Sequence, residues 1–269
     1  MVLFYITVAL SLILGIIYHE YGHMITSKHY KIKVNRFSVG FGPILWKKKG
    51  KDNVEYCLSA LPFGGYCEID EKELDSKPYY QYVLVLIAGV VRNLILGLAL
   101  FILGACLLFI ANGKAPNLLF AIQGAFDALW NVMSNFFNVL IDFFNIKLVA
   151  SAGGMGTQIS TIGNGLSSFQ STTSVGSNIL SQLGLGFIVG GSFNFALLLC
   201  NLLPIPAIDG GQILIKTIRV TLLKIFKKEI FTKKLADMLN VAGFCFLLFY
   251  QGVILLCDIP AVKELILRL

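Results

Sequence analysis

Near the start of the chain, two histidines and a glutamate fall within the five residues His19-Glu20-Tyr21-Gly22-His23. On a helix, residues four apart share one face, so the imidazoles of His19 and His23 lie about one turn from each other. Two imidazoles at this spacing can ligate one Zn²⁺, and Glu20 between them can act as a general base. The surrounding stretch is apolar, and charged or imidazole groups inside an apolar helix are costly and therefore mark function. The alternative is a polar cluster at a helix end.

A hydrolytic zinc site needs a third protein ligand and one open position for water. We expect Asp209 to be this ligand. It lies in the run Asn201-Leu202-Leu203-Pro204-Ile205-Pro206-Ala207-Ile208-Asp209-Gly210-Gly211. The two prolines break an apolar helix and the two glycines permit a sharp turn. Irregular backbone at membrane depth is tolerated only where it lines a cavity. The alternative role for Asp209 is a cap of the following helix.

The composition indicates a membrane protein. Of the 269 residues, 56% are hydrophobic and only 14% are charged, whereas soluble domains carry about a quarter charged residues. A helix needs about 20 mostly apolar residues to cross the hydrocarbon layer. Stretches of this kind lie near residues 2–26, 82–111, 183–206 and 239–258. We therefore expect an α-helical membrane protein with about four transmembrane helices, the first retained rather than cleaved as a signal peptide.

The basic residues predict the topology. The formal net charge is +7, and of the 22 lysines and arginines ten lie in residues 28–82 and seven in 216–234. Basic residues collect in cytoplasmic loops, so these two segments are expected inside, and 112–182 and the N-terminus outside. This placement favours a lipid bilayer over nucleic acid as the partner. The expected segments are helix 1–27, β-region 28–81, helix 82–111, extracytoplasmic segment 112–182, helix 183–211, basic cytoplasmic segment 212–238, helix 239–258 and tail 259–269.

Two segments between the apolar helices have patterns of their own. Short stretches of β-formers at 36–39, 43–46, 54–58 and 66–69, separated by Gly, Pro and Asn, predict a small membrane-associated β-hairpin or sheet. In 118–145, polar residues recur every three or four positions, which is typical of an amphipathic helix at the membrane interface. The alternatives are a groove-lining helix or a fifth crossing. Residues 150–178, rich in Gly, Ser and Thr, are expected to form a loop.

These motifs together resemble the site-2 protease family of intramembrane zinc metalloproteases. The resemblance is carried by the histidine motif, by Gly40-Phe41-Gly42-Pro43 with Pro62-Phe63-Gly64-Gly65-Tyr66, and by the run from Asn201 to Gly211. It implies Zn²⁺ held by His19, His23 and Asp209, with Glu20 as the catalytic base. It also implies a substrate that is itself a transmembrane segment, cut within or beside the bilayer.

The chain departs from the family pattern at three places. Where the family often has Ala-Gly-Pro-x-x-Asn, this chain has Ala88-Gly89-Val90-Val91-Arg92-Asn93. Arg92 either extends to the membrane surface or contacts substrate. Residues 112–182 are too short for the PDZ domain that many relatives carry, so this is expected to be a PDZ-lacking member. Asn194 does not match the spacing of an asparagine that relatives carry, and that role is not transferred to it.

The sequence thus predicts an integral membrane protease, of a bacterial plasma membrane, that hydrolyses transmembrane segments of membrane proteins or signal-peptide-like substrates. An unwound substrate would add to the free edge of the hairpin through main-chain hydrogen bonds, at Gly64, Gly65 and Tyr66. Asn201 either binds substrate backbone or satisfies its own helix. Two other classes compete: a catalytically silent relative that binds membrane segments, and a metal- or proton-coupled transporter.

Overall fold

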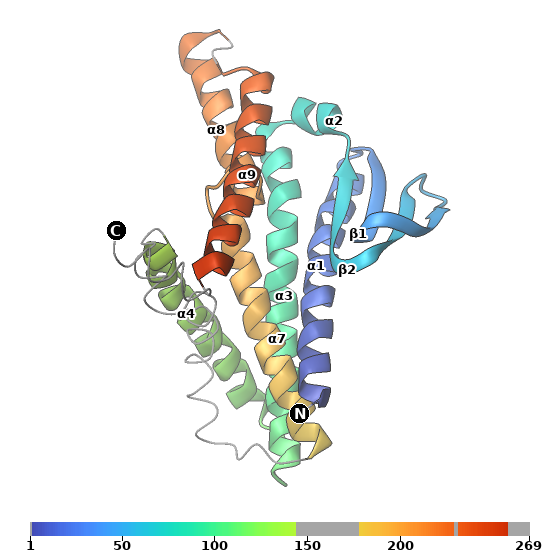
Figure 1. The fold of residues 1–269 in the computed structure, drawn as a ribbon, viewed down its shortest axis with the longest axis vertical. Coiled ribbons are helices and arrows are strands. Elements are labelled where there is room, and N and C mark those ends of the chain that lie inside the picture. The colour runs from blue at the N-terminus through green and yellow to red at the C-terminus, as the bar shows by residue number, and fades with distance from the viewer. Residues whose placement is uncertain (1, 144–177, 229–230, 258–269) are drawn as a thin grey trace.

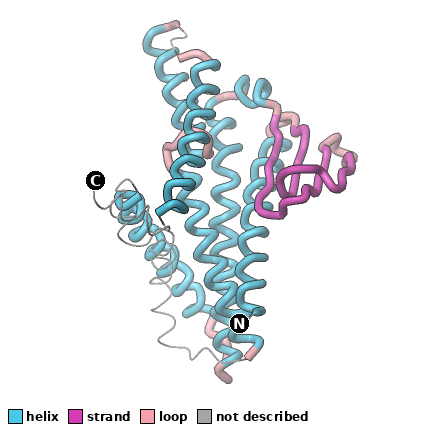
Figure 2. Tube along the Cα trace, in the orientation of Figure 1, coloured by secondary structure: helices cyan, strands magenta, loops and turns pink. Residues whose placement is uncertain are grey.

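The computed structural model describes residues 2–143, 178–228 and 231–257. The elements follow in the order α1 (Val2–His29), β1 (Val34–Lys49), β2 (Glu55–Ile69), α2 (Glu71–Ser76), α3 (Tyr79–Ala111), α4 (Leu118–Phe143), α7 (Ile179–Leu202), α8 (Asp209–Phe226) and α9 (Lys233–Cys257). Helices α1, α3 and α7 run side by side as a bundle, with the β-strands on the outer side of α1 (Figure 1). Figure 2 shows the strands as a separate unit at one flank of the helices. The prediction of a mainly helical protein with a small antiparallel sheet is confirmed.

Three helices in the described part of the chain are long and apolar enough to cross a membrane: α1, α3 and α7. They correspond to the first three crossings expected from the sequence. Helix α1 continues to His29, beyond the expected end at 27, and α3 begins at Tyr79 rather than 82. Both extensions carry polar or aromatic side chains, which hydropathy alone assigns to the neighbouring loops.

Small residues bring α3 and α7 into close contact. A Cβ added to Gly104 would lie 2.5 Å from the carbonyl oxygen of Gly184, and one added to Gly191 would lie 2.8 Å from that of Gly97. Glycine at such positions lets two membrane helices approach backbone to backbone. The adjoining core is apolar and includes Phe101 and Ile188, each 1% exposed.

The two strands form one antiparallel sheet in which both strands bend. Phe37 pairs with Cys67 on one side and with Tyr56 on the other, so the first part of β1 lies between the two ends of β2. The four short strands expected from the sequence are thus joined into two long ones. Glycines with positive φ, Gly40 at +88° and Gly64 at +131°, allow these bends without ending the strand. The outer edge of residues 65–69 consequently faces α1.

The segment 183–211, expected as an apolar helix broken by two prolines, contains α7 and the start of a second helix. Helix α7 ends at Leu202, and a separate helix, α8, begins at Asp209 and continues into the segment expected to be a basic connector. Pro204 and Pro206 cannot continue the helical hydrogen bonding, and this ends α7. A Cβ on Gly211 would collide with the backbone of Ile205, so only glycine permits the tight return.

Helix α4 packs on α3 and α7 through small residues, Ala121 and Ala125, both fully buried. Its polar residues Gln123, Asp127 and Asn131 are exposed, as expected for the amphipathic segment. The loop expected at 150–178, apart from its last residue, lies outside the described residues, as does the tail 259–269.

We expect Gly104→Ala to destabilise the protein by about 1–3 kcal/mol, because its methyl group would press against the backbone of α7. The measurement is thermal unfolding of the detergent-purified chain. Gly252→Ala in α9 is the matched control, since nothing lies within 4 Å of a Cβ there. Equal unfolding temperatures for the two variants would contradict the close packing of α3 and α7.

Candidate metal centre

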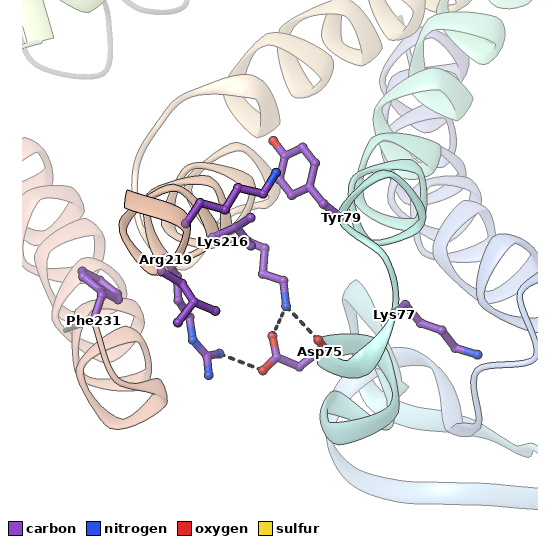
Figure 3. A pocket seen from close by; sticks show the side chains of 9 residues that line it. Asp75, Lys77, Tyr79, Lys216, Arg219 and Phe231 are labelled. Atoms are coloured by element: carbon purple, nitrogen blue, oxygen red, sulfur yellow. Dashed lines mark hydrogen bonds and ion pairs between the residues drawn. The ribbon is translucent and has the colours of Figure 1, made fainter. Parts of the chain in front are cut away.

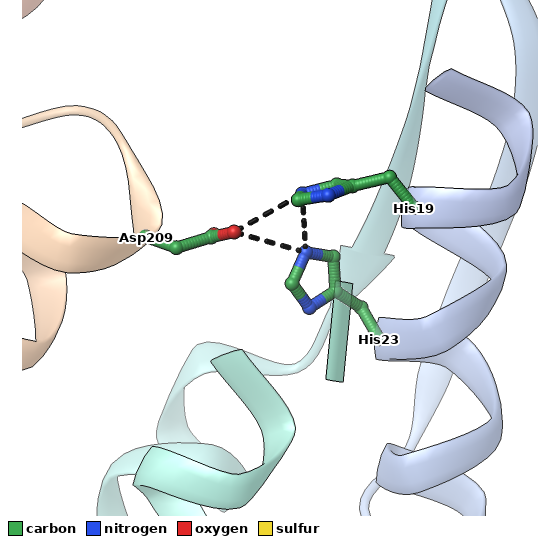
Figure 4. Close-up of side chains that lie close together, drawn as sticks. All are labelled: His19, His23 and Asp209. Carbon is green, nitrogen blue, oxygen red and sulfur yellow. Dashed lines mark hydrogen bonds and ion pairs between the residues drawn. The ribbon is translucent and has the colours of Figure 1, made fainter. Parts of the chain in front are cut away.

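Three buried side chains from distant parts of the chain meet between α1 and the start of α8. His19, His23 and Asp209 are 7%, 6% and 8% exposed. The Nε2 atoms of the two histidines lie 3.1 Å apart, and the Asp209 Oδ2 lies 3.0 Å from the first and 3.5 Å from the second. Figure 4 shows the three groups pointing at one another. The fold therefore brings together the residues that the sequence suggested as metal ligands.

The spacing of these atoms fits a tetrahedral metal. A Zn²⁺ site with ligand distances of about 2.0–2.1 Å places neighbouring ligand atoms about 3.3 Å apart, close to the three separations observed here. In addition, Asp209 Oδ2 is buried and accepts no hydrogen bond of proper geometry from the described residues. A buried carboxylate oxygen without a donor is costly. The donor set of two imidazoles and one carboxylate, with a further position open, suits Zn²⁺ in a hydrolytic site.

The other ring nitrogens of both histidines are held by α3. His23 Nδ1 lies 2.8 Å from the carbonyl oxygen of Val85 and therefore carries the proton, which leaves Nε2 as the lone-pair atom. His19 Nδ1 lies 3.2 Å from the side-chain amide of Asn93, whose Oδ1 has no other hydrogen-bond partner among the described residues. With the amide turned so that Oδ1 accepts from Nδ1–H, Oδ1 gains a donor and His19 Nε2 is left as the lone-pair atom. Both histidines are thereby oriented with Nε2 toward Asp209.

Two glycines let α3 approach α1 at this level. A Cβ on Gly89 would lie 2.6 Å from His23 Nε2 and 2.7 Å from His19 Nε2. A Cβ on Gly22 would lie 2.6 Å from the carbonyl oxygen of Ala88. Any larger residue at Gly89 would therefore fill the space in which the imidazoles and a metal must lie.

Glu20 stands beside the three groups and touches the sheet. Its Oε2 accepts a hydrogen bond of 2.9 Å from the backbone N–H of Cys67 in β2. A Cβ built on Gly65 would lie 3.9 Å from Glu20 Cγ. Since alternate residues of a strand point their backbone groups to the same edge, Gly65 and Cys67 both present N–H and C=O groups toward the site.

The remaining residues suggested as substrate-binding lie near this edge or in α7. Gly64 is buried. The ring of Tyr66 stacks on that of Phe41, with 6.2 Å between the ring centroids. The side-chain amide of Asn201 donates to the carbonyl oxygen of Leu197 in its own helix at 3.0 Å. Asn194 is fully buried, and its side-chain amide donates to the carbonyl oxygen of Gly190 in its own helix at 2.8 Å.

Arg92 of α3 packs against two tyrosines of α1. Its guanidinium lies 5.0 Å from the ring centroid of Tyr18 and 5.6 Å from that of Tyr21, and it donates a hydrogen bond of 2.8 Å to the Tyr18 hydroxyl. These two tyrosines flank His19 and Glu20 in α1. A cation over aromatic faces is stabilised by the ring quadrupoles, so Arg92 braces the turn that carries the motif against α3.

The sequence reasoning missed Asn93, Gly89 and the Val85 carbonyl as parts of the site. The available signal was spacing, because Val85, Gly89 and Asn93 recur every four residues and share one face of α3. A lone asparagine in such an apolar helix is costly and marks function. The carbonyl of Val85 carries no sequence signal, because every residue has one.

The chain is similar to a peptidase family and to several proteins named as proteases. The model of Peptidase family M50 matches residues 7–250. The zinc metalloprotease Rip1 of Mycolicibacterium smegmatis is 36% identical over 34% of this chain and 27% of its own length. The regulator of sigma E protease of Haemophilus influenzae is 38% identical over 29% of this chain and 20% of its own length. The matched part thus spans less than a third of these relatives.

We expect Asn93→Leu to weaken Zn²⁺ binding about 10- to 100-fold, because His19 loses the group that orients its ring. The measurement is a competition titration of the detergent-purified chain against a zinc chelator. Asn194→Leu removes another buried asparagine without touching a histidine, so it controls for the general effect of the substitution. Equal zinc affinities in the two variants would contradict the orienting role of Asn93.

Proposed function

Because the chain belongs to peptidase family M50, we propose that it is a zinc-dependent intramembrane endopeptidase, with His19, His23 and Asp209 as the metal ligands and Glu20 as the catalytic base. The observation that carries the proposal is the convergence of two Nε2 atoms and one carboxylate oxygen within 3.0–3.5 Å of one another. The glutamate next to them lies at an edge of β2 that pairs with no further strand among the described residues. The names of the relatives, zinc metalloprotease and regulator of sigma E protease, support the same reaction.

Zn²⁺ bound at these residues would polarise the scissile carbonyl and make water a better nucleophile at neutral pH. Glu20 accepts the proton of the attacking water and delivers it to the leaving nitrogen of the peptide bond. The Cys67 N–H holds one oxygen of this carboxylate, which leaves the other for proton transfer. Asn93 and the Val85 carbonyl keep the two imidazoles in position throughout.

The substrate in this proposal is a transmembrane segment of a membrane protein or a signal-peptide-like segment. A helix hides its carbonyls in its own hydrogen bonds, so it must unwind before it can be cut. The strand edge at Gly65, between Gly64 and Tyr66, supplies main-chain partners for an unwound strand, and this mode of binding tolerates varied sequence. The side-chain amide of Asn201 uses one N–H within α7, which leaves its second N–H and its oxygen for substrate backbone.

The proposed setting is the bacterial plasma membrane, with α9 as a fourth crossing and the N-terminus outside. The lysines of 28–82 and 216–234 support this orientation, because basic residues are retained on the cytoplasmic side. The sheet and the metal centre would then lie at the cytoplasmic end of the bundle. In this proposal residues 28–81 and 212–238 are cytoplasmic and residues 112–182 extracytoplasmic, and Asp209 lies in the first turn of α8.

Two other functions use the same residues. A catalytically silent relative would bind membrane segments without cutting them, and a transporter would use the buried histidines and carboxylate as an ion path. Glu20 beside a free sheet edge favours the protease, since neither a binder nor a transporter needs a base at that place.

We expect Glu20→Gln to retain zinc and to lower the cleavage rate of a transmembrane substrate by about 10²- to 10⁴-fold, because the general base is lost. Asp209→Ala should lower both zinc content and cleavage. The measurements are metal analysis of the purified variants and a cleavage assay in detergent or vesicles. Glu71→Gln, an exposed glutamate of α2, should match the unmodified chain. Full cleavage by the Glu20 variant would rule out the assignment.

A photoreactive phenylalanine analogue in place of Tyr66 is expected to crosslink to a model transmembrane substrate held by the Glu20→Gln variant. The same analogue in place of Trp130, exposed on α4, should give little product. Equal yields at the two positions would count against substrate binding at the sheet edge. The readout is mass spectrometry of the crosslinked peptides.

A further inference from the structure

A second polar site lies apart from the metal centre, between α2 and α8. A cavity of about 450 Å³ is lined by Asp75, Lys77, Tyr79, Lys216, Arg219, Val220, Leu223, Lys224 and Phe231. Figure 3 shows Asp75 on one wall and Lys216 and Arg219 on the opposite wall. The proposed protease mechanism uses none of these residues.

One carboxylate in this cavity is shared by two cations. The ammonium of Lys216 contacts Asp75 Oδ1 and donates to the Asp75 carbonyl oxygen at 2.8 Å, while Arg219 Nη1 donates to Asp75 Oδ2 at 2.7 Å. Lys216 is only 8% exposed, and its ammonium also lies 5.0 Å from the ring centroid of Tyr82. Partial burial raises the pKa of Asp75, but Lys216 and Arg219 outweigh it and hold the pKa below its ordinary value. Asp75 is therefore ionised at neutral pH.

The lining remains positive after this pairing. Among the lining residues that the structure describes, Lys216, Arg219 and Lys224 carry three positive charges against the single negative charge of Asp75, a formal excess of two. Lys77 is left out of this sum because its ammonium is directed away from Asp75 (Figure 3). The other two acidic residues of α2 have partners elsewhere: Glu71 pairs with Lys233 at 3.5 Å, and Glu73 accepts a hydrogen bond of 2.7 Å from the backbone N–H of Lys33. A partly enclosed, cation-lined cavity favours an anion with several acceptor oxygens.

The setting of the cavity is amphipathic. It lies where α3, a helix of membrane-spanning length, begins at Tyr79. On α8, the exposed apolar side chains of Ile218, Leu223 and Phe226 alternate with its basic ones. Basic pockets beside membrane helices recognise phosphate-bearing head groups, with apolar neighbours against the acyl chains.

We propose that the cavity between α2 and α8 is a binding site for the phosphate group of an anion, supplied by an anionic phospholipid head group or by free phosphate. Arg219 and Lys224 donate to the phosphate oxygens, and Asp75 holds Lys216 and Arg219 in place for this contact. The Tyr79 hydroxyl, hydrogen-bonded to Thr217 at 2.7 Å, closes the wall next to α3. This site is separate from the proposed protease centre and does not depend on its activity.

The test uses the full chain purified in a neutral detergent and titrated with fluorescent short-chain phosphatidylglycerol, with phosphatidylcholine as the uncharged comparison. We expect saturable binding of phosphatidylglycerol that weakens as salt is added. Lys224→Gln should weaken it about fivefold and Lys224→Glu about 25-fold, following the contribution of one basic residue near an anionic head group. Lys114→Gln, an exposed lysine just beyond the other end of α3, should leave it unchanged. Thermal unfolding checks that each variant is folded.

Inorganic phosphate forms the second arm of the experiment. If it displaces phosphatidylglycerol, or binds alone with the same dependence on Lys224, the site accepts free phosphate and the proposal holds with that source. If only phosphatidylglycerol binds, the source is the lipid head group. Phosphatidylcholine binding as tightly as phosphatidylglycerol, or affinities for both phosphate-bearing probes that do not change in the Lys224 variants, would overturn the proposal.

Discussion

Three polar side chains buried in an apolar bundle set the main constraint on this structure. Imidazole and carboxylate groups removed from water are costly unless each polar atom finds a partner. His19 and His23 meet that requirement at Nδ1 through α3, and their Nε2 atoms face Asp209 from the start of α8. The arrangement leaves a common point among three ligand atoms, which a metal ion would satisfy. Three features of the fold allow these contacts: the close approach of the helices, the helix break after α7 and the bend of the sheet.

The first feature is the close approach of α3 to α1. Asn93 and the Val85 carbonyl can reach the imidazoles only if α3 lies almost against α1, and Gly22 and Gly89 allow this distance. The same device recurs between α3 and α7, where Gly104 and Gly184 meet. Because lipid provides no hydrophobic drive for helix association, backbone proximity and packing hold such a bundle together. The geometry of the site and the stability of the bundle therefore share one structural basis.

Two further features position the site. The helix break after α7 turns Asp209 back toward α1, and the bend of the sheet brings β2 to Glu20. Positive-φ glycines keep β1 and β2 continuous through their bends, so one strand edge reaches Glu20. Arg92 adds a support from the opposite side through Tyr18 and Tyr21. The sequence had suggested the membrane surface or substrate for Arg92, and in the structure its guanidinium lies over two tyrosines of the helix that bears the histidines.

Local features of the sequence were enough to predict the apolar helices, the amphipathic segment, the histidine motif and the candidate third ligand. Hydropathy, helical spacing and proline positions are properties of short stretches, so they can be read without knowing which stretches touch. The contacts of Asn93 and Gly89 with the histidines, the joining of four short strands into two, and the Asp75 cluster with Lys216 and Arg219 could not be predicted in this way. Each depends on the register between segments far apart in the chain, and that register is set by packing. The sequence by itself determined which groups could do chemistry. Only the tertiary structure decided which neighbours orient them, because a neighbour orients a side chain only when packing brings the two into contact.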